Sequence, residues 1–441
     1  MQVSVEESGA LKRRLSVTIP GENIETEVAR RLEGLGKRAK IKGFRPGKAP
    51  AKVVRQQYGA AIREDVLEEL VRSHYAEAVA QENLAPAGEP SFDPGKTAND
   101  GSYTFVAELE VYPQFDPRGV DELVLTRPRV EIADADVDEV MQRLRRQKGQ
   151  WVEVKRPAVA GDRVVLDFEG RIEGEPFEGN TEKDMALVLG SHETIPGFEE
   201  GLEGITTGAA RALDLEFPSD YRKQDLAGRP VRFEVTAHRI EALELPALED
   251  AFAVAYGVGE GGLARLRARV RENMTAEAEE RIRAELLHGL SDQLVAANPI
   301  EVPTALTEEE IARQKRIALR RFGIAPEERQ LLSLPREPFA DTAERRVRLG
   351  LILSRLIERE AFRPDPARVE KRIMEFTADA EDPVAEARKI RTDNEAMRQI
   401  EALVLEDMAY DWLLEQATIT EEPRGFFEFM EPREGGATEQ K

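Results

Sequence analysis

The sequence of 441 residues contains no cysteine. That absence excludes disulfides, thiolate metal sites and cysteine nucleophiles, and it is typical of proteins kept in a reducing compartment. No apolar run approaches the ~18 residues that a membrane-spanning helix needs, so no membrane partner is expected. The opening MQVSVEESGA has no basic segment followed by an apolar run, so we predict no secretory signal and expect a cytoplasmic location.

Aromatic residues are scarce at 6%, whereas charged residues make up 34% and give a formal net charge of -22. This balance is typical of a highly solvated, helix-rich protein. Nucleic acid repels so acidic a chain, so DNA is not an expected partner, and any contact with RNA must use a local basic patch. The length suggests about three domains.

Hydrophobic patterning divides the chain into five segments. Residues 1–112 are predicted to contain a strand, two helices and a second strand, and residues 113–149 a connector that ends in a helix. Short strands and glycine turns across 150–245 are typical of a compact antiparallel β domain with one short helix. Prolines divide 246–423 into separate helices, and 424–441 are expected to be a disordered tail.

One short segment reverses the sign of the charge. Eleven Lys and Arg and a single acid fall between Arg30 and Arg63, and the middle of this segment, KIKGFRPGKAP, joins the first two predicted helices. Pro46 and Gly47 suit the central positions of a type II turn, which would place Phe44 at an exposed tip. A run of basic residues alone is usually a solvated face, but an apolar ring displayed in water indicates a binding partner.

Other motifs favour no further chemistry. GVGEGG at 257–262 has the spacing of a dinucleotide-binding loop, but a helix-like segment precedes it, so a loop before the next helix is favoured. The four histidines lie far apart in the sequence, so we predict no metal site. No G-x-S-x-G motif is present, and neither a nucleophile nor a cofactor is expected.

Aromatic residues of the predicted β domain fall on separate elements and could all converge inward. They are Phe168, Phe177, Phe198, Tyr221 and Phe233. A domain of ~95 residues needs an apolar core in any case, so the residues alone favour a core over a binding pocket and leave both readings open.

These segments together resemble the trigger factor family of bacterial ribosome-associated chaperones. GFRPGKAP is similar to the family's ribosome-docking signature, and DRVVLDFEGRIEGEPFEG, IPGFEEGLEGI and VRFEVTAHRI are similar to an FKBP-type prolyl isomerase domain. The implied fold class is a multidomain α+β protein. It would have an N-terminal α/β ribosome-docking domain, an FKBP-like antiparallel β domain with one short helix, and a C-terminal all-α domain with helical arms, along which the 113–149 linker packs.

The resemblance also implies two sets of site residues. The docking set would meet protein and rRNA of the large ribosomal subunit near the tunnel exit, and comprises Gly43, Phe44, Arg45, Pro46, Gly47 and Lys48. The isomerase set would line an apolar basin, and comprises Phe168, Phe177, Met185, Ile195, Phe198, Tyr221 and Phe233. A backbone N–H near Ile195 and the Tyr221 hydroxyl would position the peptide. Phe198 stands where human-type members have a tryptophan, and Glu178 where they have an aspartate.

The implied function is a ribosome-docked chaperone that shields unfolded nascent polypeptides and isomerises X–Pro bonds without a covalent intermediate. It would serve protein folding and export, and a weak homodimer off the ribosome is expected. One alternative is a free-standing prolyl isomerase whose helices form a dimer. Another, an RNA-binding protein, is disfavoured because the chain has a net charge of -22 and its strongest excess of Lys and Arg is confined to one segment.

Overall fold

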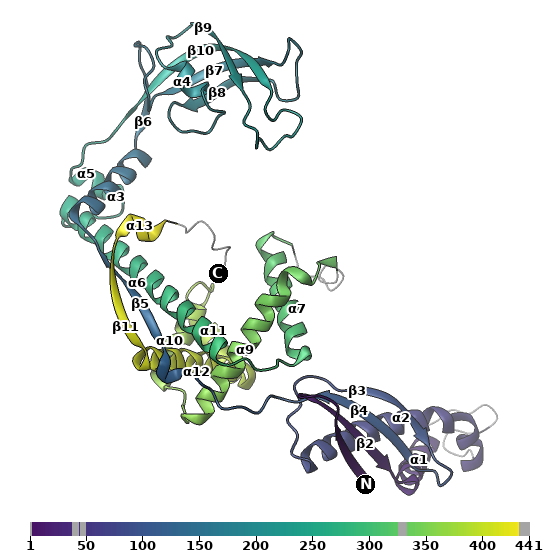
Figure 1. The fold of residues 1–441 in the computed structure, drawn as a ribbon. Coiled ribbons are helices and arrows are strands. Elements are labelled where there is room, and N and C mark those ends of the chain that lie inside the picture. The colour runs from purple at the N-terminus through teal and green to yellow at the C-terminus, as the bar shows by residue number, and fades with distance from the viewer. Residues whose placement is uncertain (1, 38–43, 45–49, 325–332, 432–441) are drawn as a thin grey trace. The chain divides into compact units, whose positions relative to one another are not determined.

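A computed structural model describes residues 2–37, 44, 50–324 and 333–431 (Figure 1). The chain divides into two compact units, one formed by 1–127 with 284–420 and the other by 128–283 with 421–441. Among the described helices, none is long and apolar enough to cross a membrane.

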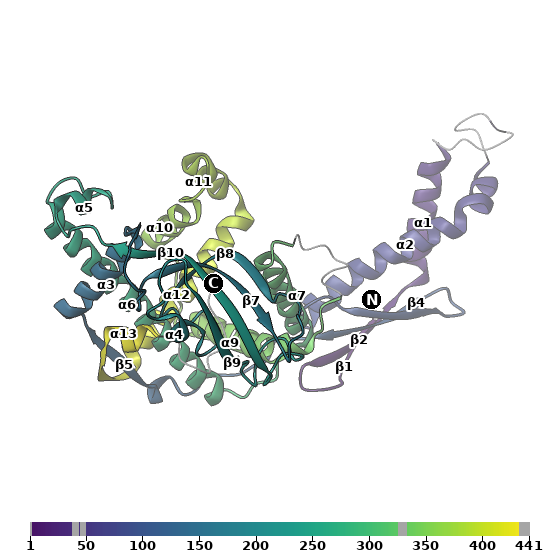
Figure 2. The same ribbon diagram turned by 90° about the horizontal axis from the view of Figure 1, so that it is seen from above.

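The N-terminal part of the first unit is an antiparallel sheet packed against two helices (Figure 2). In spatial order its strands are β1 (Gln2–Glu7), β2 (Lys12–Ile19), β4 (Tyr103–Glu110) and β3 (Ser91–Thr97). The helices are α1 (Gly21–Gly36) and α2 (Ala51–Gln81), which pack against each other. Leu15, Val17 and Ile19 of β2 are buried because side chains alternate across a strand. The sequence predicts both helices and the two inner strands, but neither edge strand.

The rest of the first unit is mainly helical. Its elements are the 3₁₀ turn η1 (Val120–Glu122), the end of α6 (Gly262–Ala297), α7 (Thr304–Arg321), α9 (Glu337–Arg359), α10 (Pro366–Thr377), α11 (Pro383–Thr392) and α12 (Asn394–Gln416). The prolines that open α10 and α11 follow Asp365 and Asp382, whose carboxylates accept hydrogen bonds from first-turn N–H groups. A proline tolerates the first helical turn but not the interior, which explains the predicted division into separate helices.

One strand pair begins in this helical part and ends in the second unit. β5 (Val124–Glu131) pairs with β11 (Thr418–Gly425), and neither strand is predicted from the sequence. The Thr420 hydroxyl donates to the Leu125 carbonyl at 3.3 Å, across 295 positions of the chain. Local periodicity carries no signal for a pairing between segments so far apart.

The expectation of a disordered tail from residue 424 is wrong for 424–431. α13 (Phe426–Met430) follows β11, and its Phe426 and Phe429 are buried. The Arg281 guanidinium donates two 2.8 Å hydrogen bonds to the carbonyls that end this segment. The segment is ordered because its aromatic side chains find apolar partners. The remainder of the expected tail lies outside the described residues.

Helical elements of the second unit share a small apolar core. α3 (Asp134–Gln147), α5 (Asp250–Val254), the start of α6 and α13 contribute to it. The GVGEGG segment is the loop before α6, as the sequence indicates, and the Asp250 carboxylate accepts a 2.8 Å hydrogen bond from the Leu263 N–H. No member of this core, among the residues that the structure describes, comes from 150–245.

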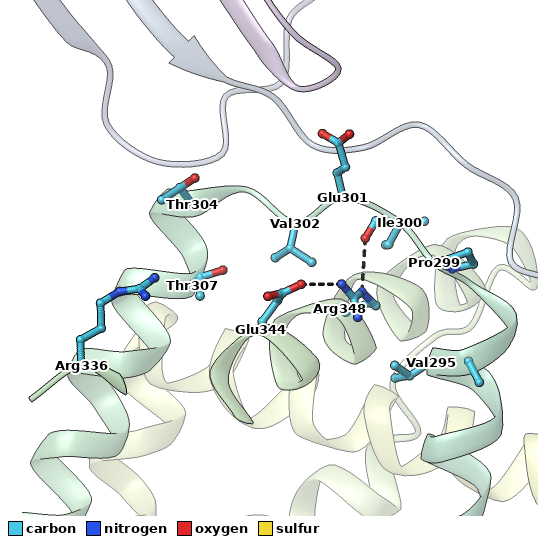
Figure 3. A pocket seen from close by; sticks show the side chains of 11 residues that line it. Val295, Pro299, Ile300, Glu301, Val302, Thr304, Thr307, Arg336, Glu344 and Arg348 are labelled. Atoms are coloured by element: carbon cyan, nitrogen blue, oxygen red, sulfur yellow. Dashed lines mark hydrogen bonds and ion pairs between the residues drawn. The ribbon is translucent and has the colours of Figure 1, made fainter. Parts of the chain in front are cut away.

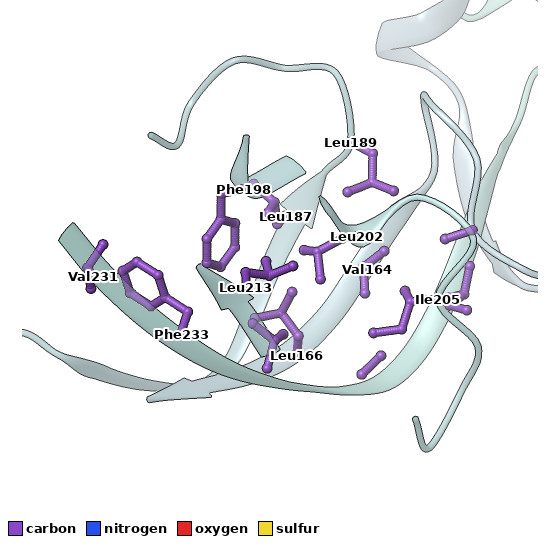
Figure 4. Packing of buried hydrophobic residues seen from close by; sticks show 14 of the residues in the cluster. Val164, Leu166, Leu187, Leu189, Phe198, Leu202, Ile205, Leu213, Val231 and Phe233 are labelled. Carbon is purple, nitrogen blue, oxygen red and sulfur yellow. The ribbon is translucent and has the colours of Figure 1, made fainter. Parts of the chain in front are cut away.

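An antiparallel sheet makes up the rest of the second unit and confirms the predicted β domain. Its path is β6 (Gln150–Glu153), β10 (Pro230–Glu244), β7 (Arg163–Arg171) and β8 (Thr181–Val188), with β9 (Ala210–Glu216) also paired to β10. The single short helix of this domain is α4 (Phe198–Leu202), within the described chain. The predicted alternation along β10 is present, since Val231, Phe233 and Val235 are buried. All three belong to one apolar cluster with residues of α4, β7 and β9, and Figure 4 shows Val231 and Phe233 within it.

Candidate functional site

Predicted aromatic residues of the β domain come together at one end of its core. The rings of Phe198 and Phe233 stand edge to face with centroids 5.2 Å apart (Figure 4). Phe168 lies 5.7 Å from Phe233 and 6.0 Å from Phe198, again edge to face. Such pairs contribute roughly 0.5–1.5 kcal/mol each beyond the area that they bury. Three separate elements therefore supply one aromatic cluster.

Phe217 completes this cluster and was not predicted as a site residue. Its ring centroid lies 5.9 Å from that of Phe177, 4.8 Å from that of Tyr221 and 6.5 Å from that of Phe233. It joins the two outer aromatic residues to the inner group. The signal that could have found it is the alternation of β9, which continues inward to this position.

Burial within the aromatic cluster is graded. Phe198, Phe217 and Phe233 are buried. The remaining predicted residues are only partly buried, and they are Phe168, Phe177, Met185, Ile195 and Tyr221. A closed core would bury all of them, so the cluster is a core on its inner side and an apolar surface on its outer side.

Gly170 of β7 allows the rings to approach the strand. A Cβ at this position would lie 2.6 Å from the Phe233 ring and 3.1 Å from the Phe177 ring, too close for either ring to stay in place. Gly197 has φ +87°, a conformation that side chains rarely adopt, and it directly precedes the cluster residue Phe198. Backbone geometry on two elements is thus adapted to the aromatic cluster.

The loop before Ile195 is organised around a carboxylate that the sequence did not single out. Glu199 is 4% exposed. Its oxygens accept hydrogen bonds from four backbone N–H groups of residues 190–194, at 2.7 to 3.3 Å. Burial by itself raises the pKa of Glu199, but the hydrogen bonds from His192 and Gly190 outweigh it and hold the pKa below its ordinary value.

A second buried carboxylate anchors the turn before β7. Asp162 is 3% exposed and accepts hydrogen bonds of 2.5 and 2.9 Å from the Arg156 guanidinium and one of 2.9 Å from the Val159 N–H. Burial raises the pKa of Asp162, but the hydrogen bonds from Arg156 and Val159 lower it by more than burial raises it. The pKa of Asp162 therefore lies below its ordinary value. Both buried acids therefore stabilise the β domain only while they are ionised.

The stability of the β domain is accordingly expected to fall as the solution is acidified. Both folded-state pKa values are depressed, so the stabilisation is fully present above the ordinary values of 4.5 for Glu199 and 3.8 for Asp162, and is lost as pH falls through the folded values. Denaturant titrations from neutral pH to about pH 3 would measure this. Trp412→Phe leaves Trp151 of β6 as the sole tryptophan and a reporter of this domain. A denaturant midpoint that stays constant over this range would contradict the expectation.

One group of three side chains among the described residues could hold a metal ion. Asp167, Asp184 and His238 place their ligand atoms within 4.8 Å of one another. The Asp184 N–H and the His238 ring hydrogen-bond to Asp167, at 2.8 and 3.0 Å, and lower its pKa. These hydrogen bonds account for the arrangement without an ion. The sequence could not reveal the group because β7, β8 and β10 each supply one member.

The structure describes only one of the predicted docking residues. Phe44 is 41% exposed and lies between the end of α1 and the start of α2. The others are outside the described residues, namely Gly43, Arg45, Pro46, Gly47 and Lys48.

A hollow of about 730 Å³ lies between the end of α6, α7 and α9 (Figure 3). Three of its four charged residues are already paired. Glu344 contacts Arg348 at 2.5 Å, Arg348 also donates to the Ile300 carbonyl at 3.2 Å, and Arg336 pairs with Glu308 at 2.7 Å. None of the predicted site residues lines this hollow, so it gives no reason to place the function here.

Comparison with known proteins covers nearly the whole chain. Residues 1–144 match the family model "Bacterial trigger factor protein (TF)", 262–415 match the model of its C-terminus, and 154–238 match "FKBP-type peptidyl-prolyl cis-trans isomerase". The trigger factor of Thioalkalivibrio sulfidiphilus is 40% identical over 100% of both chains, and that of Halorhodospira halophila is 40% identical over 99% of both. A solved structure reported as "Promiscuous Substrate Recognition in Folding and Assembly Activities of the Trigger Factor Chaperone" covers 94% of this chain and 99% of its own, at 18% identity and a TM-score of 0.48.

Proposed function

This chain belongs to the trigger factor family, and from that premise we propose that it is a ribosome-associated chaperone that acts on nascent chains and isomerises their X–Pro bonds. Its FKBP-type domain makes it a peptidyl-prolyl cis–trans isomerase. The observation that supports locating this activity at the aromatic cluster of the β domain is the graded burial of its residues. An apolar face that stays partly open is what a proline side chain needs.

Rotation about an X–Pro bond must break amide resonance, against a barrier of about 18–20 kcal/mol. In the planar amide, resonance places partial charge on the carbonyl oxygen. Rings such as Phe198 and Phe233 solvate that charge poorly, so the aromatic cluster disfavours the planar amide relative to the twisted one. The reaction then needs no covalent intermediate. Each ~1.4 kcal/mol removed from the barrier accelerates it about tenfold.

Two polar groups beside the aromatic cluster are suited to hold the peptide. The Ile195 N–H and the Tyr221 hydroxyl donate to no other group among the residues that the structure describes, and both residues are partly exposed. We propose that these two groups donate hydrogen bonds to the peptide carbonyls next to the proline. Phe198 and Phe233 would form the floor beneath the proline ring, and Phe168 one wall.

Phe198→Ala and Phe233→Ala are each expected to lower kcat/KM for an X–Pro peptide about tenfold or more, because each opens the site to water. Truncating a buried Phe also costs roughly 3–5 kcal/mol of stability, so circular dichroism must first show folded protein. Phe198→Leu offers a milder variant. Phe252→Ala, a buried ring of α5 outside the aromatic cluster, is the matched control. Folded variants with wild-type turnover would leave the cluster a purely structural core.

The chaperone activity is assigned to exposed apolar side chains of the helical part. Phe322 at the end of α7 is 81% exposed, and Met374, Phe376 and Val384 of α10 and α11 are also exposed. Scattered apolar side chains on separate helices bind many unfolded sequences weakly, and the charged residues around them keep the chaperone soluble.

The finer details of partners and location are also proposals. Phe44 would insert at the large ribosomal subunit near the tunnel exit, with Arg45 and Lys48 contacting rRNA or acidic side chains. A cytoplasmic location and a weak homodimer off the ribosome fit this role. The free-standing isomerase is disfavoured because the family matches extend over the N-terminal and C-terminal parts as well as the isomerase domain.

A further inference from the structure

Two neighbouring acids of α4 have opposite environments. The Glu200 carboxylate is exposed and accepts one 3.0 Å hydrogen bond from the Gly197 N–H at the start of this helix. Glu199 is buried instead, and its carboxylate accepts six hydrogen bonds. Four come from backbone N–H groups and two from hydroxyls. The donors are Gly190 N–H at 2.7 Å, His192 N–H at 3.1 Å, Glu193 N–H at 2.9 Å, Thr194 N–H at 3.3 Å, Thr194 hydroxyl at 3.1 Å and Ser191 hydroxyl at 3.4 Å.

The loop held by Glu199 leads directly to the peptide-binding N–H assigned above. Thr194 contacts the carboxylate through both its N–H and its hydroxyl, and Ile195 follows it. The Ile195 carbonyl in turn accepts a 3.1 Å hydrogen bond from the Phe198 N–H. The peptide plane that carries the Ile195 N–H is thus fixed by the Glu199 carboxylate on one side and by α4 on the other.

We propose that Glu199 is a positioning residue for the isomerase, whose carboxylate fixes residues 190–194 and thereby aims the Ile195 N–H at a carbonyl of the bound peptide. This inference rests on the proposed function of the aromatic cluster. A hydrogen bond to that carbonyl forms in both the planar and the twisted states, so its loss weakens binding of both equally. The consequence is a higher KM with little change in kcat, unlike the loss of an aromatic ring.

Glu199→Gln in the full chain tests this, with Glu200→Gln as the matched control on the same helix. Each carboxylate oxygen of Glu199 accepts at least two backbone N–H groups, so an amide nitrogen in either position meets donors that it cannot satisfy. We expect Glu199→Gln to raise KM for an X–Pro peptide about tenfold with kcat within about threefold, and to accelerate amide hydrogen exchange across 190–194. Glu200→Gln should keep KM within about twofold.

An unchanged KM in folded Glu199→Gln would overturn the inference, and so would a lower kcat at constant KM. If this variant fails to fold, Thr194→Val decides, since it removes one hydroxyl donor and keeps the carboxylate. We expect it to raise KM about threefold, and an unchanged KM would again overturn the inference. Wild-type protein without turnover would refute the proposed function itself. Loss of turnover in Phe198→Ala alongside normal kinetics in Glu199→Gln would refute only the role of Glu199.

Discussion

Simultaneous replacement of Phe44, Arg45 and Lys48 by alanine is expected to abolish co-sedimentation with ribosomes and to leave the fold intact. Phe44 is 41% exposed, so its removal costs the folded chain little. An aromatic anchor at an interface contributes about 2 kcal/mol or more. The two cations belong to the most basic segment of a chain with net charge -22, and they add further contacts. Together these losses correspond to at least a hundredfold weaker binding.

The control for this variant likewise removes one phenylalanine and two cationic residues, at another place in the chain. Arg320, Arg321 and Phe322 at the end of α7, changed together to alanine, should leave ribosome binding unchanged. Wild-type binding should also weaken as salt concentration rises, because contacts between cations and phosphates release counterions. If the first triple variant pellets with ribosomes as well as wild type does, the basic loop is a solvated face and docking occurs elsewhere.

Deletion of residues 150–245, bridged by a short Gly-Ser linker, is expected to eliminate prolyl isomerisation while ribosome docking and suppression of client aggregation remain. The apolar core of the β domain is self-contained, because every described member of it lies within 154–240. The apolar core of α3, α5, α6 and α13 in turn uses no described residue from 150–245. Removing the domain therefore leaves the apolar core of α3, α5, α6 and α13 with all its described members.

The two ends of this deletion lie side by side. β6 and β10 are antiparallel, and Gln150 is the direct partner of Glu244 in their ladder. Partners in such a ladder have Cα atoms about 4.5–5.5 Å apart, so a linker of a few residues spans the gap. The Arg145 side chain of α3 also hydrogen-bonds the Pro246 carbonyl at 2.5 Å, beyond both cut points.

Light scattering during dilution of a denatured client would measure what the deletion retains. Full-length Phe198→Ala is the matched control, since it should lose turnover with the β domain still present. A deleted protein that folds and docks but suppresses no aggregation would place the client surface in the β domain and refute our assignment to the helices.

Patterns confined to one element made much of this fold predictable. β10 alternates buried and exposed residues, and α2 places Val66 and its neighbours at helical spacing. Five aromatic residues of the β domain could be selected because a short domain needs an apolar core and these rings fall on separate elements. Whether that core reached the surface could not be predicted, because burial of Phe168 and Tyr221 depends on loops whose positions the sequence does not encode locally.

The features that the sequence did not predict depend on pairing with partners distant in the sequence, or on the burial of a polar residue. The edge strand β3 (Ser91–Thr97) contains Pro94 and Gly95, which are depleted in strands, and only pairing with β4 orders it. Glu199 stands in the charged run FEEG beside Glu200, and nothing in that run distinguishes the buried acid from the exposed one. The distinction arises from the direction of α4 relative to the loop at 190–194.

The pairing of β5 with β11 constrains the order in which the protein can fold during its own synthesis. Synthesis runs from the N-terminus, so the β domain can close as soon as its own residues are made, whereas Leu125 must wait for Thr420, 295 positions later. At roughly 5–20 residues per second, that wait lasts about 15 to 60 s. During it β5 is an unpaired strand on an unfinished chain, the kind of segment that promotes aggregation. The pair of β5 and β11 is therefore expected to be among the last elements of the fold to form.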